Sequence, residues 1–206
     1  MLPIYLASAS PRRRELMEQL GLRFSVVVSN IDENSMDERI TPGMMVEELS
    51  LKKAVEVARE LSSGLVIGSD TVVVWGNRIL GKPRDRQDAV EMLACLQGGH
   101  HWVFSGLAVI DAESGKTHVS HEKTRVYFRA ADMDEIERYA DTGEPMDKAG
   151  AYAIQGLGSV FVKGIEGCYS TVVGLPLARL AAVLKDFGVD VLSLQGRRNC
   201  GQNPEF

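Results

Sequence analysis

The segment Leu65–Trp75, LVIGSDTVVVW, constrains the fold of this chain most strongly. Seven apolar residues flank a Gly-Ser-Asp-Thr run, which predicts a buried strand with a polar interruption. Aspartate is depleted in strands, and burying a carboxylate without a partner costs several kcal/mol. An isolated aspartate in such a place often caps a neighbouring loop instead. Because the polar residues form a triplet, we favour a cleft, in which Asp70 holds a divalent cation or polarises a water and Thr71 offers its hydroxyl to a ligand.

The remaining chain alternates between expected strands and helices without a repeat. Strands are predicted over 4–8, 24–28, 65–75, 78–80, 102–111, 117–128 and 160–165, and helices over 11–20, 44–62, 85–96, 132–139 and 176–187. Gly76-Asn77 offers a two-residue hairpin turn after the buried strand. Such interleaving predicts an α/β fold. From residue 193 the chain has no apolar period and is expected to be a mobile tail.

Net charge, apolar stretches and cysteine content limit the partners and the location that this chain can have. The 206-residue chain has a formal net charge of −5, which argues against a general nucleic-acid-coating protein. No apolar stretch reaches the roughly 20 residues of a membrane span, and we see no secretory signal. The three cysteines are odd in number and form no Cys-x-x-Cys pair, which favours reduced thiols and a cytoplasmic location. An anionic ligand would therefore need a local cluster of cations.

Three arginines follow Ser10-Pro11, where a helix is expected to begin with Ser10 as N-cap. Cations are unfavourable at this positive end of a helix unless they are solvated or bind an anion. Arg14 aligns with Glu18 for a solvent-facing i,i+4 pair. Arg12 and Arg13 instead lie on or beside the buried stripe, behind a tight turn whose N–H groups suit a phosphate. We predict that these two face a ligand; the alternative is a fully solvated triplet.

Further candidate cations lie in three segments. Lys53 borders the apolar arc of the 44–62 helix, where it either faces a ligand or reaches water, whereas Lys52 points into the polar face. Lys82 follows the hairpin in LGKPRD, which alone is an ordinary surface turn. Residues 143–158, GEPMDKAGAYAIQGLG, place charged and amide side chains among small residues that allow close approach to a ligand. The alternative for this segment is a solvated glycine-rich loop.

Within this last segment, Gln155 offers the donor and acceptor that recognition of a base edge requires. Glu144, Asp147 and Lys148 are its charged members. His118 and His121 have loose metal-like spacing, but positions three apart on a strand face opposite sides, so we reject them as a zinc site.

Several of these segments occur together, in order, in a known family. The stretches LASASPRRRELM, IDE, LSLKKA, GSDTVV, LGKPRD, DKAGAYAIQGLG and STVVGLPL span Leu6 to Leu177. Together they resemble the Maf-like (septum-formation inhibitor) family of nucleotide pyrophosphatases. With a glutamine after AYAI, the sequence resembles the subgroup of this family that acts on dTTP and UTP. CTP and modified pyrimidine nucleotides remain open as substrates.

The resemblance implies a fold like that of the inosine-triphosphate pyrophosphatases: an elongated mixed sheet, flanking helices and a deep cleft between two lobes of one domain, residues 1–192. It implies hydrolysis of a nucleoside triphosphate to the monophosphate and pyrophosphate with Mg²⁺ or Mn²⁺. Carried over by position, the catalytic acid is Asp70, the second cleft acid is Glu33, and both are expected at the metal. The catalytic lysines are Lys53 and Lys82. The positions that set base preference are Arg12, Thr71 and Gln155.

The residues read independently agree with this expectation. Clustered cations can hold a magnesium-bound triphosphate, and carboxylates supply the oxygen ligands that Mg²⁺ prefers. We therefore add Ser8, Arg13, Asp147 and Lys148 to the expected substrate-binding residues. Two rivals are a non-catalytic nucleotide-binding regulator of cell division and a phosphatase that releases single phosphates. We expect a nucleotide substrate, no membrane and no stable nucleic-acid partner; a homodimer is implied only by the family.

Overall fold

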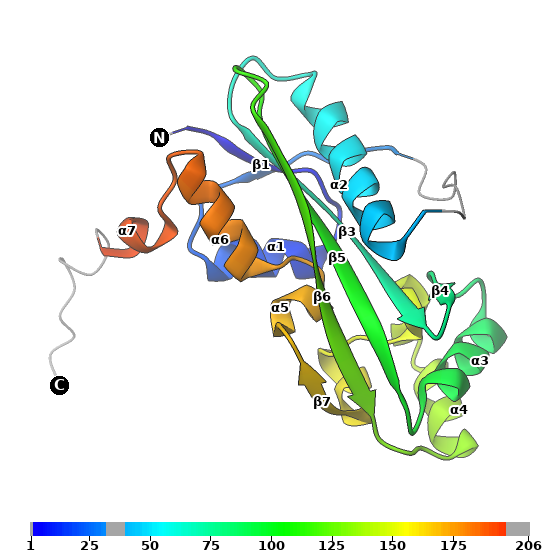
Figure 1. Ribbon diagram of the computed structural model, residues 1–206. Helices are drawn as coiled ribbons and strands as arrows, with labels where there is room; N and C mark the ends of the chain where they lie inside the picture. Colours follow the sequence, from blue (N-terminus) through cyan, green and yellow to red (C-terminus); the bar gives the residue numbers. More distant parts are fainter. Residues whose placement is uncertain (1, 32–39, 197–206) are drawn as a thin grey trace, which may run out of the picture.

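Three long strands form the centre of the structure. The computed structural model describes residues 2–31 and 40–196, with side chains up to residue 193. Strands β3 (Leu65–Trp75), β5 (His100–Asp111) and β6 (Thr117–Phe128) run through the middle of the sheet, and β5 is antiparallel to the strand on each side of it (Figure 1). The seven-stranded sheet has the order β2-β1-β3-β5-β6-β7, with β4 paired to β3. It is mixed, because β2 (Ser25–Val26), β1 (Ile4–Leu6) and β3 are parallel. The predicted mixed α/β fold is confirmed.

The outer edge of β3 is left open at its polar interruption. β1 pairs with residues 65–67 of β3, and β4 (Arg78–Leu80) pairs with residues 73–75. Since β5 occupies the other edge, no described strand covers residues 68–72 on this one. This unpaired part of the edge, beside Asp70 and Thr71, therefore leaves an opening from which a ligand can reach both faces of the sheet.

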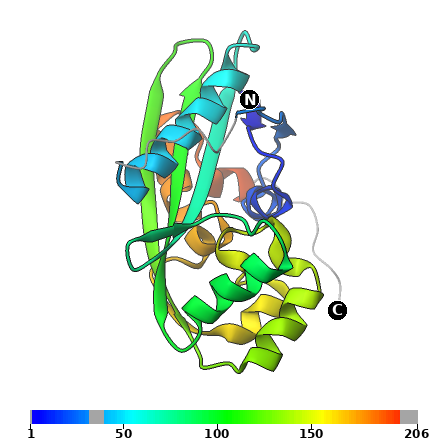
Figure 2. The ribbon, with the colours of Figure 1, turned by 90° about the vertical axis from the view of Figure 1, so that its right-hand side faces the viewer.

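Helix α2 (Pro42–Ala58) covers one face of the sheet. It packs through Ala54 and Val57 against Val66 of β3 and Ala108 of β5. The other elements that bury apolar residues lie on the opposite face, as the side view in Figure 2 shows. These are α1 (Pro11–Gln19), α3 (Arg86–Leu96), α4 (Met133–Asp141), α5 (Tyr169–Val173) and α6 (Leu177–Asp186).

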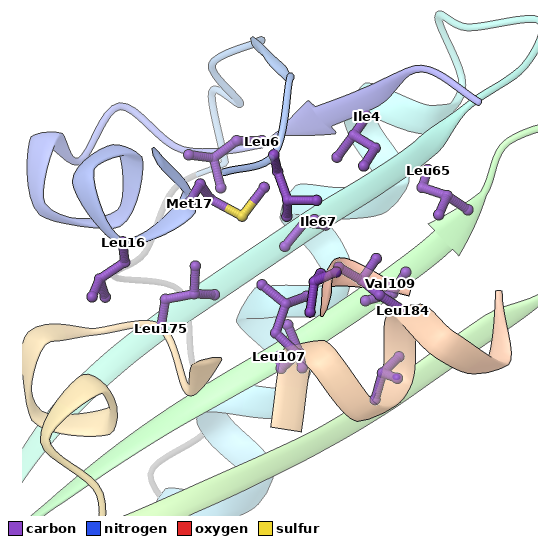
Figure 3. Packing of buried hydrophobic residues seen from close by; sticks show 14 of the residues in the cluster. Ile4, Leu6, Leu16, Met17, Leu65, Ile67, Leu107, Val109, Leu175 and Leu184 are labelled. Atoms are coloured by element: carbon purple, nitrogen blue, oxygen red, sulfur yellow. The ribbon is translucent and has the colours of Figure 1, made fainter. Parts of the chain in front are cut away.

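Two apolar clusters divide that opposite face into two lobes. In the first, α1 and α6 pack against β1, β3 and β5 through residues such as Met17, Ile67 and Leu107 (Figure 3). In the second, α3 and α4 pack against the other end of the strands around Val103 and Phe128. The short 3₁₀ segments η1 (Glu144–Asp147), η2 (Ala149–Ala151) and η3 (Gly156–Phe161) complete this lobe and lead into β7 (Val162–Glu166). The polar residues 69–71 of β3 lie between the two clusters.

Several predicted boundaries move for local reasons. The helix expected over 44–62 begins earlier, because the Thr41 side chain caps it by accepting from Met44 N at 3.3 Å and Pro42 takes the first position; it ends at Ala58. Ser10 precedes α1 as expected, but its side chain makes no capping bond. The strand predicted over 160–165 begins only at Val162, after η3.

The C-terminal segment differs from the expected irregular tail in its first residues. Helix α7 (Val191–Gly196) continues past residue 193. Residues 197–206 lie outside the described part of the chain, so the domain boundary at 192 stays a prediction. Within the described residues no helix is long and apolar enough to cross a membrane.

A buried histidine in the second lobe predicts how stability depends on pH. His101 is 1% exposed and its Nε2 lies 2.7 Å from the Tyr152 hydroxyl, between the rings of Phe128 and Tyr152. Among the described residues its Nδ1 has no hydrogen-bond partner. Burial, with a smaller contribution from His100, lowers the pKa of His101 to about 3. The folded protein therefore holds this imidazole neutral.

We expect the free energy of unfolding to fall as pH drops from 6.5 toward 3, because the unfolded chain binds the proton first. At about 1.4 kcal/mol per pH unit, this one group accounts for about 2 kcal/mol between pH 6.5 and pH 5. His101→Gln keeps a partner for Tyr152 and cannot titrate, so its stability should fall by about 2 kcal/mol less over the same interval. Denaturant unfolding at both pH values measures this difference; equal losses in the two proteins would contradict the assignment.

Candidate active site

The two lobes enclose a cleft of about 560 Å³ at the open edge of β3. It is lined from both faces of the sheet and by the segments that follow β1 and β4. Of the residues predicted from the sequence, those that line it are Ser8, Arg12, Arg13, Lys53, Asp70, Thr71, Lys82, Asp147, Lys148 and Gln155. Glu33 lies outside the described residues, so its placement stays a prediction.

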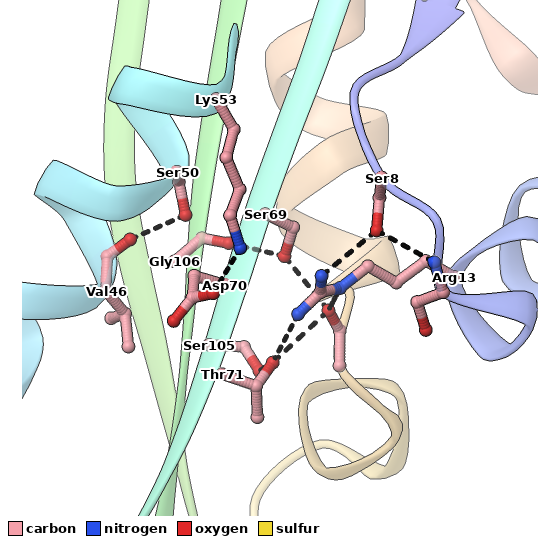
Figure 4. A network of polar contacts seen from close by, with 12 residues as sticks. Ser8, Arg13, Val46, Ser50, Lys53, Ser69, Asp70, Thr71, Ser105 and Gly106 are labelled. Carbon is pink, nitrogen blue, oxygen red and sulfur yellow. Dashed lines mark hydrogen bonds and ion pairs between the residues drawn. The ribbon is translucent and has the colours of Figure 1, made fainter. Parts of the chain in front are cut away.

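Asp70 and Lys53 form a buried ion pair on the α2 face of β3. Lys53 Nζ donates to Asp70 Oδ1 at 2.6 Å, and the two side chains are only 7% and 10% exposed (Figure 4). The alternative in which Lys53 extends into water is therefore wrong. Lys52 lies on the polar face of the helix and pairs with Glu48 at 2.7 Å, as its position predicted. Removing one partner from a buried pair is far more costly than losing a surface pair, so these two residues depend on each other.

Arg13 lies on the other side of β3 from Lys53, as Figure 4 shows. It donates from Nε to Gly174 O at 2.8 Å, from Nη1 to Ser8 Oγ at 3.1 Å and from Nη2 to Thr71 Oγ1 at 3.1 Å. These bonds join α1, β3 and the end of α5. Arg14, in contrast, pairs with Glu18 at 2.9 Å on the surface, which confirms the predicted i,i+4 pair.

A chain of hydroxyl groups continues from Arg13 into the sheet. Thr71 Oγ1 lies 2.9 Å from Ser105 Oγ, and Ser105 Oγ donates to Thr171 O at 2.7 Å. Ser69 Oγ donates to Gly106 O at 2.7 Å or to Gly174 O at 2.9 Å. Sequence reasoning missed Ser105, because a serine within a strand is unremarkable until the register places it opposite Thr71.

Arg12 and Lys148 meet at Asp147 beside the opening of the cleft. Arg12 Nη1 lies 3.4 Å from Asp147 Oδ2, and Lys148 Nζ donates to Asp147 Oδ1 at 2.5 Å and to Glu144 O at 2.6 Å. Partial burial works to raise the pKa of Asp147, but the hydrogen bond and charge of Lys148 and the charge of Arg12 leave it lowered. These contacts connect the first turn of α1 to η1 of the second lobe.

The carboxylate of Glu144 binds groups within the protein rather than facing the cleft. Its carboxylate accepts from Tyr139 Oη at 2.9 Å, Leu157 N at 3.0 Å and Gly158 N at 2.9 Å. These bonds hold the start of η3 against α4, so Glu144 shapes the loop that carries Gln155. The glycine-rich segment is thus an ordered wall of the cleft, and the alternative of a solvated loop is wrong.

The two histidines with metal-like spacing have separate partners. His118 Nε2 lies 3.0 Å from Ser120 Oγ, and His121 Nδ1 lies 2.7 Å from Glu47 Oε1. Across residues 2–31 and 40–193, no group of three or more His, Cys, Asp or Glu side chains is placed to hold a metal ion by itself.

The mixed sheet with helices on both faces is a fold that this chain shares with a solved structure. The chain superposes on the HAM1 protein from Coxiella burnetii with a TM-score of 0.52 at 14% identity, covering 90% of this chain and 100% of that one. This similarity shows the fold, as the sequence resemblance implied.

The chain belongs to the family of Maf-like proteins, whose family model matches residues 3–187. It is 56% identical over 192 residues to a protein from Desulforamulus reducens that is named dTTP/UTP pyrophosphatase. A relative of the same name from Pelotomaculum thermopropionicum is 57% identical, also over 192 residues. Each alignment covers 93% of this chain and all of the relative.

Proposed function

We propose that this protein is a nucleoside triphosphate pyrophosphatase that hydrolyses dTTP and UTP to the monophosphate and pyrophosphate. One observation carries the proposal: a buried Asp70–Lys53 pair shares a single cleft with a row of cations. The relatives that are 56% and 57% identical to this chain bear the name of that activity.

The cleft has two chemically different ends, which suit the two ends of a nucleotide. Lys53 and Asp70 lie on the α2 side of β3, and Lys82 lines the same cleft; charge-assisted hydrogen bonds from the lysines, about 1.5–3 kcal/mol each, would hold the triphosphate. The Thr71 side of β3 presents an apolar wall, which suits the flat faces of a pyrimidine. Its members are Val73, Val103, Tyr152, Val172 and Val173. Arg12, Thr71 and Gln155 are the proposed base-selecting residues.

Asp70 is the proposed general base. Lys53 holds Oδ1 and thereby fixes the orientation of the carboxylate, so Oδ2 can accept a hydrogen bond from a water. That oxygen takes the proton as the water attacks a phosphorus of the α–β linkage. The bond from that phosphorus to the bridging oxygen breaks, and the chain separates into the monophosphate and pyrophosphate. Lys82 and Lys148 stabilise the negative charge that develops on the leaving group.

A divalent cation, Mg²⁺ or Mn²⁺, fits this donor set. Mg²⁺ is commonly bound by one or two carboxylates together with substrate phosphates and waters, rather than by a complete protein cage. Asp70, with Glu33 as the proposed second carboxylate, would supply the protein oxygens. When bound, the cation would neutralise phosphate charge and polarise the scissile linkage.

Product analysis tests the proposed function. With Mg²⁺ or Mn²⁺, purified protein should convert dTTP and UTP to monophosphate and pyrophosphate in equal amounts. Stepwise release of inorganic phosphate would instead identify a phosphatase. Tight binding of either nucleotide without products would support the regulator of cell division. A homodimer and a cytoplasmic location remain predictions from the resemblance and the cysteine usage.

A further inference from the structure

The hydroxyl of Thr71 donates its single proton in a hydrogen bond within the protein. Ser105 Oγ lies 2.7 Å from Thr171 O, and a carbonyl oxygen cannot donate, so the Ser105 proton is used there. The 2.9 Å contact between Ser105 Oγ and Thr71 Oγ1 must then take its proton from Thr71. The only other acceptor within hydrogen-bond distance of Thr71 Oγ1 in the described chain, Gly174 O, is 3.5 Å away and already receives Arg13 Nε at 2.8 Å.

One acceptor position on Thr71 remains for a ligand. A hydroxyl has one donor and two acceptor positions. Arg13 Nη2 fills one acceptor position at 3.1 Å, and Ser105 receives the proton. Because Thr71 lines the cleft and is only partly buried, a ligand can still approach it. That ligand group has to be a hydrogen-bond donor. Phosphate oxygens are acceptors and do not meet this requirement.

The surroundings of Thr71 indicate which donor it is. On the same face of β3, Val73 and Val173 belong to the apolar wall of the cleft, whereas Lys53 and Asp70 lie on the opposite face. A nucleobase is the part of a nucleotide that combines an apolar face with N–H donors at its edge. Uracil and thymine carry an N–H at N3, and cytosine carries a bare acceptor nitrogen at that position.

From this geometry we infer that Ser105 is a specificity-determining positioning residue, which keeps Thr71 an acceptor for the N3–H of uracil and thymine. The inference rests on the proposed function and deepens it. Cytosine N3 would face the lone pair of Thr71, and neither group could donate. Ser105 itself is fully buried and does not line the cleft, so its effect passes through the Thr71 hydroxyl.

The first experiment changes the substrate and leaves the protein intact. Wild-type protein should bind the non-hydrolysable α,β-methylene analogue of UTP about 10- to 100-fold more tightly than the same analogue methylated at N3 or the corresponding CTP analogue. This is the range for one buried hydrogen bond lost with its acceptor left unpaired. Equal dissociation constants for the UTP analogue and its N3-methyl form would overturn the inference.

The second experiment changes Ser105. In Ser105→Ala the proton of Thr71 is released and can turn toward cytosine N3. The ratio of kcat/KM for UTP to that for CTP should fall about tenfold, whatever happens to overall activity. Ser50→Ala is the matched control, because Ser50 is equally buried and donates to Val46 O at 2.6 Å, but it does not line the cleft. Its ratio should equal that of the wild type.

The outcomes separate this inference from the proposed function. If Ser105→Ala lowers kcat/KM for UTP and CTP by the same factor, Ser105 is only structural and the inference is wrong. If wild-type protein releases no pyrophosphate but still discriminates against the N3-methyl analogue, the base-reading role holds and the catalytic proposal fails. Should Ser105→Ala not fold, the binding comparison with wild-type protein decides the question.

Discussion

Replacing Asp70 with asparagine is expected to lower kcat for UTP by about 1,000-fold or more. A positioned general base contributes typically 10²- to 10⁴-fold, and asparagine cannot take a proton from water. The amide oxygen can still accept from Lys53 Nζ, so the side chain should keep its place in the strand. The loss of charge weakens that bond, and we expect a decrease of about 1.5–3 kcal/mol in the free energy of unfolding.

Asp111→Asn provides a matched control for this change. Asp111 lies at the far end of β5, outside the cleft, and its carboxylate accepts from Ser114 Oγ at 2.7 Å in an exposed turn. Single-turnover kinetics with both variants, alongside thermal unfolding, separates chemistry from stability. A cooperative unfolding transition shows that the Asp70→Asn variant is folded. If the folded variant retained kcat within tenfold of the wild type, Asp70 would not be the general base.

Local sequence patterns predicted the elements that carry the site. Strand 65–75 was predicted with its observed ends, because an apolar run bounded by glycines and a hairpin turn leaves few alternatives. The i,i+4 spacing separated Arg14 from its neighbours, and Glu18 is indeed its partner. In both cases the decisive interaction lies within one element or between adjacent residues, where spacing determines geometry.

Contacts between distant segments could not be predicted in this way. Lys53 occupies an ambiguous border position on its helix, and only the packing of α2 on the sheet buries it against Asp70, 17 residues away. Gly174 and Thr171 take part in the network through their main-chain carbonyls. Every residue has such a carbonyl, so the residue type does not indicate this role. The role of Ser105 depends on the β3–β5 register, and register is a property of two strands together.

The distance between α2 and the sheet is set by two glycines, and this predicts the largest effect on stability. A Cβ built on Gly106 would lie 2.1 Å from Val46 O and 2.5 Å from Ser50 Oγ, and one on Gly68 would lie 2.2 Å from Ser50 O. The backbone atoms of a helix are held in place by its hydrogen bonds and cannot move one at a time. An added methyl therefore has to displace α2 as a whole. Gly106 is directly opposite Asp70 in the β3–β5 register, so that displacement acts where Lys53 reaches the strand.

We therefore expect Gly106→Ala to lower the free energy of unfolding by about 3 kcal/mol or more, which corresponds to a decrease in Tm of about 6–12 °C for a chain of this size. Activity should fall as well, because the 2.6 Å contact between Lys53 and Asp70 depends on the same spacing. Gly164→Ala is the matched control: Gly164 is also a strand glycine, and nothing lies within 4 Å of its added Cβ. Thermal unfolding of both variants tests the claim, and a Gly106→Ala protein as stable as Gly164→Ala would show that α2 does not rest on this glycine.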